Sequence, residues 1–139
     1  MLKGVYILII KLQKKRDITI GKLGTISFVA GYYVYVGSAL NGLSPRIARH
    51  LKSEKSLHWH VDYFLCTSKV VEIMYGLSQG KKECTLASQL TREMTPVLGF
   101  GCSDCSCKSH FFFYKDFCEV RKIARNSLKK CGLEPRVWE

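Results

Sequence analysis

The sequence lacks long apolar runs, internal repeats and low-complexity segments. No stretch of its 139 residues approaches the roughly 18 apolar residues that a membrane-spanning helix needs. The apolar N-terminal stretch MLKGVYILIIKL is rich in β-branched residues, has no small-residue cleavage site and runs into basic residues, which is not typical of a signal peptide. The length suits one domain with a real core and is too short for two. We therefore expect a single cytoplasmic domain over residues 1–139.

Acidic residues are scarce relative to basic ones. Eleven Asp and Glu stand against 22 Lys and Arg, which gives a net charge of +11. A basic surface favours a polyanionic partner, because every phosphate that it contacts releases condensed counterions. Nucleic acid is the first candidate partner, an anionic membrane surface is the second, and a basic protein without such a partner is the third. The charge alone does not choose among them.

Cysteine, in contrast, is abundant. Seven cysteines are many for an intracellular chain, and the number is odd. Three of them fall within CSDCSCKSH, whose thiols invite a metal or redox interpretation. The other four are scattered and are predicted to be small buried residues: Cys66, Cys84, Cys118 and Cys131.

Sequence patterning predicts an α+β domain. Runs of β-branched and aromatic residues predict strands, and apolar residues at every third or fourth position predict helices. The predicted strands cover 4–12, 32–36, 69–77 and 110–115, with a hairpin over 18–28, and the predicted helices cover 44–51, 58–65, 83–94 and 120–132. This order of elements indicates a small, mainly antiparallel mixed β-sheet flanked by helices. Residues 100–139 would form a cysteine-rich turn, the last strand and a basic C-terminal helix.

The stretch GYYVYVGSALNGLSPRIARH joins a tyrosine-rich strand to a basic helix. Ser44 is predicted as the N-cap of that helix and Pro45 as its first residue. Arg46, Arg49 and His50 then follow at positions i, i+3 and i+4, so they share one polar face.

A tyrosine pair and a lone glutamate stand out beside this basic face. Tyr33 and Tyr35 share one face of the strand 32–36. Glu83 projects from the apolar stripe of the helix 83–94, where a carboxylate needs a partner and a cation is a suitable one. Each residue also has an ordinary interpretation, because tyrosines pack well in sheets, helical arginines usually form a solvated face and a first-turn glutamate favours the helix dipole.

Several motifs follow one another in the order of a known family. The chain carries GVY at residues 4–6 and YVG at 35–37, followed by RIARHL, HWHVDYFL, an EC-x-LA helix and FGCSDC-x-C-x-SHFFFY. Over roughly residues 3–115 this series resembles the GIY-YIG nuclease superfamily, in particular its Uri-type branch, named for UvrC and intron relatives and also found fused to DNA-repair enzymes. The resemblance implies a small mixed sheet with packed helices and metal-dependent hydrolysis of a phosphodiester bond in DNA.

The resemblance also implies roles for five residues. Tyr6 and Tyr35 take the places of the two motif tyrosines, and Arg46 that of the helix arginine. His50 occupies a position that is tyrosine or histidine in similar nucleases. Glu83 is the candidate for the lone metal-binding glutamate and would hold Mg²⁺ or Mn²⁺.

The chemistry of these residue types agrees with such a reaction. Arginine offers the fork of donors that phosphate oxygens prefer, and one carboxylate can hold Mg²⁺ when waters and phosphate oxygens complete its shell. A tyrosine acts as a base only if nearby cations lower its pKa from about 10. We expect Tyr6 or Tyr35 to be the base and His50 to be a phosphate or proton partner, a division of labour that the sequence leaves open. The hypothesis requires phenols, cations and carboxylate to line one groove.

Some features depart from the family pattern. Twenty-eight residues, positions 7–34, separate Tyr6 from Tyr35, and the additional hairpin would affect substrate access. The position after YVG, often lysine in relatives, is Ser38, which removes one charge able to reach a phosphate. No equivalent is evident of the asparagine that some relatives place after the glutamate helix. Asp104 either stabilises a turn or supports the active-site cluster.

The cysteine-rich segment has the spacing Cys-x2-Cys-x-Cys-x2-His. Its members Cys102, Cys105, Cys107 and His110 are ligand types that zinc prefers, but so short a loop wraps poorly around one tetrahedral ion. Three other residues are candidates to complete a partial site: His58, His60 and Cys118. The alternatives are small buried cysteines that shape a turn, or a redox disulfide, which a reducing cytosol disfavours.

These observations predict a DNA-cutting enzyme, monomeric or homodimeric, with no membrane partner and with a repair enzyme as a candidate partner. Nucleic-acid contacts are expected from Ser38, Arg49, Arg121, Lys122 and Arg125. The competing hypothesis is a non-catalytic module that binds nucleic acid, RNA included, and is stabilised by zinc.

Overall fold

Strand β1 (Gly4–Leu12) forms the centre of the sheet. The computed structural model describes residues 1–139. In it, six antiparallel strands follow the order β6-β7-β4-β1-β5-β8. The remaining bounds are β4 (Gly31–Ala39), β5 (Lys69–Leu77), β6 (Thr95–Pro96), β7 (Phe111–Tyr114) and β8 (Arg136–Val137). β1 pairs with β4 on one side and β5 on the other, and all but one of its side chains are buried, as its continuous apolar pattern predicted.

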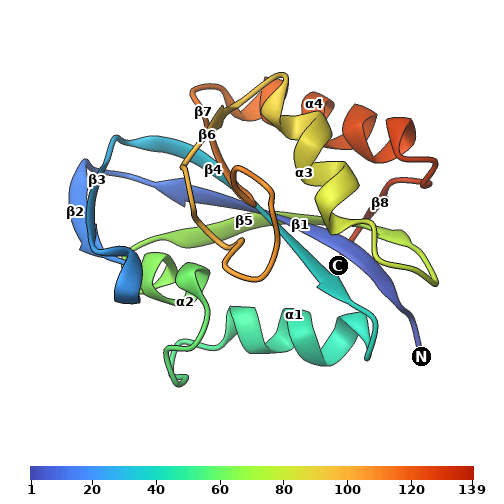
Figure 1. Ribbon diagram of the computed structural model, residues 1–139, viewed down its shortest axis with the longest axis horizontal. Coiled ribbons are helices and arrows are strands. Elements are labelled where there is room, and N and C mark those ends of the chain that lie inside the picture. Colours follow the sequence, from blue (N-terminus) through green and yellow to red (C-terminus); the bar gives the residue numbers. More distant parts are fainter.

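Helices cover both faces of this sheet (Figure 1). α1 (Leu43–Leu51) and α2 (His60–Leu65) pack on one face, and α3 (Glu83–Thr91) and α4 (Phe117–Lys130) on the other. A separate hairpin of β2 (Arg16–Thr19) and β3 (Thr25–Phe28), joined through a short turn η1 (Gly21–Leu23), extends one end of the molecule. The predicted α+β class is confirmed. None of the helices has the length and apolarity needed to span a membrane.

The alternation of side chains along the strands divides the core in two. Tyr6, Leu8 and Tyr35 point toward α1 and α2, where they meet the buried Ile47 and Phe64. The intervening residues of β1 and β4, among them Ile7 and Val36, point toward Leu90 of α3 and Leu128 of α4. Tyr33 and Tyr35 therefore lie on the same face, as predicted.

Several helix boundaries differ from the prediction because of local hydrogen bonding. α1 begins at Leu43, so Ser44 lies within the first turn and is not the N-cap. α2 begins only at His60, because the Asp62 carboxylate accepts the backbone amides of His58 and Trp59 ahead of the helix. α3 ends at Thr91, before β6 begins, and α4 begins at Phe117, where Asp116 provides the cap.

Most of the scattered cysteines are more exposed than predicted. Cys66, Cys84 and Cys118 are exposed, and only Cys131 is a small buried residue. All seven cysteines of the chain are free.

Candidate active site

A polar pocket of about 490 Å³ opens on the face of the sheet that carries α1 and α2. β7 pairs with β4 only from Tyr32 to Tyr35, so no strand lies beside the remainder of β4 on that side. The first turn of α3 and the loop 97–110 close this gap and complete the pocket. The residues that give the pocket its chemistry are Tyr35, Gly37, Ser38, Arg46, Trp59, His60, Lys81, Glu83 and Asp104.

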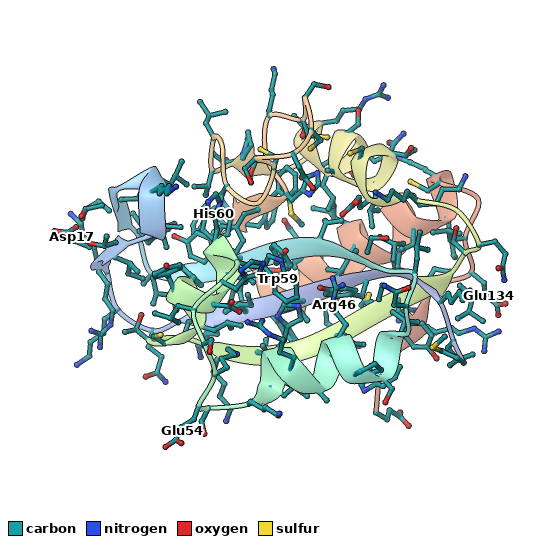
Figure 2. All side chains as sticks on the ribbon, turned by 60° about the horizontal axis from the view of Figure 1, so that its bottom comes forward. Asp17, Arg46, Glu54, Trp59, His60 and Glu134 are labelled. Carbon is teal, nitrogen blue, oxygen red and sulfur yellow. The ribbon has the colours of Figure 1, made fainter.

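The pocket brings together residues that the sequence analysis had selected from distant segments. Tyr35 and Ser38 come from β4, Arg46 from α1 and Glu83 from α3, and all four line it. Figure 2 shows the labelled Arg46 and Trp59 next to each other in front of the sheet. The predicted common groove is therefore found for Tyr35, Arg46 and Glu83, whereas Tyr6, Arg49 and His50 do not line it.

Tyr6 and His50 form a buried pair behind this pocket. The Tyr6 hydroxyl lies 2.6 Å from Nε2 of His50, and the two residues are only 1% and 2% exposed. A Cβ on Gly37 would come within 2.3 Å of the Tyr6 hydroxyl, so the glycine of YVG lets that hydroxyl approach the pocket floor. Tyr35 lines the pocket, but Tyr6 and His50 do not: Tyr6 lies against Gly37 of the pocket wall, and His50 borders a second cavity together with Lys55 and Asp62.

Burial sets the protonation of this pair. Desolvation lowers the pKa of His50 to about 4, so the ring is neutral at pH 7. In the tautomer that carries its proton on Nδ1, the neutral ring accepts the Tyr6 hydroxyl proton at Nε2, and Nδ1 is buried without a partner. His50 was predicted to be a phosphate or proton partner; it hydrogen-bonds Tyr6 and does not line the pocket, so its role stays a prediction.

The two phenols resist ionisation. Burial raises the pKa of Tyr6 and of Tyr35 above the ordinary tyrosine value, and the nearby Glu83 adds to the effect. Arg46 acts in the opposite direction on both phenols, but burial outweighs it. The hypothesis from sequence required nearby cations to lower the pKa of a phenol. In the protein itself, the pKa values of both phenols are raised instead.

Trp59 organises the two arginines of α1. The guanidinium carbons of Arg46 and Arg49 lie 4.7 Å and 4.3 Å from the centre of its ring. Arg46 also donates to the carbonyl of Ser38 at 2.8 Å, which holds it at the pocket wall. The Ser38 hydroxyl is buried, has no partner and lies beside the pocket.

Arg49, predicted to contact nucleic acid, is engaged inside the protein. Both of its terminal nitrogens donate to the two carboxylate oxygens of Asp62 at 3.0 Å. Burial alone would raise the pKa of Asp62, but these hydrogen bonds and the amides of His58 and Trp59 lower it. The Asp62 carboxylate therefore fixes Arg49 and the segment that carries Trp59. Sequence analysis missed both Asp62 and Trp59, although their place in HWHVD was a usable signal.

Two carboxylates of the pocket suit a divalent cation. Glu83 is half-buried, Asp104 is exposed, and both line the pocket. Mg²⁺ and Mn²⁺ bind through one or two carboxylates and keep waters and phosphate oxygens in the other positions. The donor set therefore fits a cation of this class. Asp104 corresponds to the sequence-based interpretation of a residue that supports the active-site cluster.

A second group of ligands, which we call the thiolate cluster, consists of Cys84, Cys105, Cys107 and His110. One ligand atom from each lies within 4.8 Å of the others, so the group is able to hold a metal ion. This corrects the predicted set, because Cys102 is buried outside the cluster and Cys84, from the first turn of α3, takes its place. The loop 97–110 supplies three of the four ligands. The fourth, Cys84, comes from α3, and the spacing of cysteines within the loop gives no sign of it.

The basic residues of α4 lie away from the pocket. The buried side of α4 packs against the same core as α3, on the opposite face of the sheet from α1. Arg121 forms an ion pair with Glu72 at 2.8 Å, whereas Lys122 and Arg125 are exposed. Their predicted contacts with nucleic acid would therefore extend a different surface from the one that carries Arg46.

Comparison with known proteins gives one match. No curated protein and no solved structure matches the chain. The family described as "Domain of unknown function DUF123" matches residues 5–133, which include β1, the pocket, the thiolate cluster and α4. The chain therefore belongs to the DUF123 family.

Proposed function

We propose that this protein is a metal-dependent endonuclease of the GIY-YIG type that hydrolyses phosphodiester bonds in DNA. One observation carries the proposal: Arg46, Tyr35 and Glu83, from three separate segments, line a single polar pocket. Hydrolysis of a phosphodiester requires charge neutralisation, a deprotonated water and a cation bound by oxygen ligands. Arginine, tyrosine and glutamate are residue types that serve these three needs. The net charge of +11 favours a polyanionic substrate.

The side chains divide this work according to their positions. Arg46, held at the pocket wall, neutralises charge on the phosphate through its free donors. Tyr35 and the unpartnered Ser38 hydroxyl donate hydrogen bonds to phosphate oxygens. Tyr6 is buried behind Gly37, so it acts on the attacking water only once substrate binding brings that water to its hydroxyl; Tyr6 then accepts a proton from the water as it passes its own hydroxyl proton to Nε2 of neutral His50. This relay needs no free phenolate at neutral pH.

Glu83, with Asp104, would hold Mg²⁺ or Mn²⁺. The cation would supply further charge neutralisation and acidify a bound water. The thiolate cluster, whose sulfur ligands suit a softer ion, is proposed to take Zn²⁺.

We assign the activity to DNA repair or genome defence in the cytoplasm, with structured DNA as the substrate and a repair enzyme as a partner. The open pocket favours a substrate that presents an accessible backbone, such as a nicked or branched duplex. The seven free cysteines agree with a reducing compartment.

The test is cleavage of labelled nicked, branched and single-stranded DNA by the purified chain with Mg²⁺ or Mn²⁺. We expect cleavage to fall about 100-fold in Glu83→Gln and in Arg46→Ala, because each removes a group that acts on transition-state charge. Matched controls are Glu93→Gln and Arg92→Ala, two exposed changes beyond the C-terminal end of α3. Equal cleavage by all five proteins would reveal a contaminating nuclease and refute the assignment.

A second candidate function is a zinc-stabilised module that binds nucleic acid, DNA or RNA, without cutting it. The raised pKa of both phenols and the thiolate cluster favour it. It predicts salt-sensitive binding and no product with any divalent ion.

A further inference from the structure

The spacing of the thiolate cluster matches a single tetrahedral ion. Zinc–sulfur bonds of about 2.3 Å and zinc–nitrogen bonds of about 2.0 Å place adjacent ligand atoms about 3.5–3.8 Å apart. Nε2 of His110 lies 3.8 Å from the Cys84 sulfur and 3.6 Å from the Cys105 sulfur. The largest separation in the cluster, within 4.8 Å, closes to this value through side-chain movement of about 1 Å.

The ligand types select the class of ion. Three thiols and one imidazole suit zinc, whereas Mg²⁺ and Ca²⁺ prefer oxygen ligands. Four protein ligands leave no open position on a tetrahedral ion, which is typical of a structural site rather than a catalytic one.

The cluster joins the two segments that carry the acidic residues of the pocket. Cys84 directly follows Glu83 in the first turn of α3. Cys105, Cys107 and His110 belong to the loop that also contributes Asp104 to the pocket. In Figure 1 this loop, drawn in orange between β6 and β7, runs beside the sheet between α3 and α2.

The ends of the loop are anchored to the sheet and core rather than to α3: Phe100 is fully buried and stacks on Phe111, and the Val36 amide donates to the His110 carbonyl at 2.9 Å. The Gly101 amide donates to Nδ1 of His60 at 2.8 Å, which ties the loop to α2. The Gly99 amide bonds to the Lys108 carbonyl at 2.8 Å, within the loop itself. Outside the thiolate cluster, no hydrogen bond joins the loop to α3.

We infer that the thiolate cluster is a structural Zn²⁺ site that clamps the loop 97–110 onto the first turn of α3 and thereby sets the position of Glu83 and Asp104 in the pocket. The clamp itself stands on the ligand geometry, and its effect on cleavage rests on the proposed function. Removing zinc therefore loosens the loop and the acidic wall together, and it does not require the sheet to unfold.

Metal content is the first test. The full chain, purified under reducing conditions from medium containing zinc and iron, should hold one zinc per chain by elemental analysis. Cys84→Ser and Cys105→Ser should lose at least about 10-fold of that zinc, whereas Cys118→Ser, an exposed thiol outside the cluster, should keep it. Since a serine variant can fail to fold, Co²⁺ added to the metal-free wild-type chain gives a second measurement, the ligand-field spectrum of a tetrahedral thiolate site. Iron in place of zinc, full zinc in Cys84→Ser, or no tetrahedral cobalt spectrum would each overturn the inference.

Hydrogen exchange tests the clamp separately from cleavage. With zinc removed and then restored, amides of residues 81–86 and 101–108 should exchange at least about 10-fold faster in the metal-free chain, while those of β1 stay protected. Equal exchange in both forms would overturn the clamp. Zinc-dependent protection without DNA cleavage by either form would support the clamp and refute the nuclease. Cleavage that survives zinc removal, with exchange unchanged, would support the nuclease and refute the clamp.

Discussion

The core beneath α1 and α2 contains phenols and adjoins a buried histidine and aspartate, whereas the core beneath α3 and α4 is almost entirely apolar. Tyr6 and Tyr35 belong to the first core, and His50 and Asp62 are buried beside it. In the second core, the buried polar residue along α4 is Ser127. Burying polar groups is unfavourable unless each finds a partner. The concentration of such groups on one face therefore indicates where function, rather than stability alone, shapes the sequence.

The largest effect is expected on the polar face, from Asp62→Ala. The change leaves Arg49 without its partner and releases the amides that hold Trp59, so the free energy of unfolding should fall by about 4 kcal/mol. Urea denaturation measures it, with the exposed Glu54→Ala as control, expected within about 0.5 kcal/mol of wild type. A loss below about 1 kcal/mol would show that the Asp62–Arg49 pair is not needed for stability.

The apolar face should respond differently. Leu128→Ala removes a fully buried side chain of α4 and should destabilise the fold by about 3 kcal/mol through the cavity that it leaves. Cleavage by the remaining folded protein should change less than about 2-fold, because no residue of α4 lines the pocket. Leu98→Ala, at a position 69% exposed, is the matched control for stability. If the variant stays folded to the same extent as wild type but loses most of its cleavage, the two faces do not have separate roles in stability and activity.

Acid should destabilise the polar face through His50. Its folded pKa of about 4 lies below the ordinary value of 6.5, so the unfolded chain binds more protons between these values. The stabilisation is complete above about pH 6.5 and is lost as the pH falls toward 4, by an amount on the order of 3 kcal/mol. Burial also lowers the pKa of His60 and His110, which add slopes of the same sign.

His50→Gln isolates the contribution of His50 to this slope. Between pH 6.5 and 4, the free energy of unfolding of the variant should fall less steeply than that of wild type. Denaturation series at several pH values supply the comparison. Identical slopes would mean that folding does not lower the pKa of His50.

The smallest effect is expected from the exposed charges of α4. A Lys122→Ala, Arg125→Ala double variant should bind DNA within about 3-fold of wild type and leave the salt dependence unchanged, because these residues lie on the face opposite the pocket. A reduction of the salt slope by about 2 would show that the bound DNA reaches α4.

Local patterns predicted most elements of the fold. The strands 4–12 and 69–77 match β1 and β5 to the residue, because both stretches are rich in β-branched and other apolar residues. β6 and β8 were missed, since two-residue strands exist only through their pairing with β7 and β5. Ser44 was misassigned because the chain enters α1 through Gly42 without a side-chain cap.

Residues of the candidate site were likewise predicted where a local pattern was sufficient and missed where only a contact between distant segments reveals the role. Arg46 and Glu83 were selected from sequence, Arg46 because its helix follows YVG and Glu83 because it begins the EC-x-LA helix, and both line the pocket. Cys84 was missed as a ligand, and Arg49 has an intramolecular partner that was not foreseen. Both depend on contacts between segments far apart in the sequence, the thiolate cluster in one case and the Asp62 carboxylate in the other. The composition of the chain and the spacing of its residues do not predict such contacts.

The most direct test of the pocket is a crystal of the protein soaked with Mn²⁺ and measured for anomalous scattering. We expect a manganese ion in the pocket beside Tyr35 and Arg46, bound by the Glu83 carboxylate and absent from Glu83→Gln crystals. Manganese found only elsewhere, or unchanged by that substitution, would contradict the assignment of this pocket as the site of metal-assisted hydrolysis.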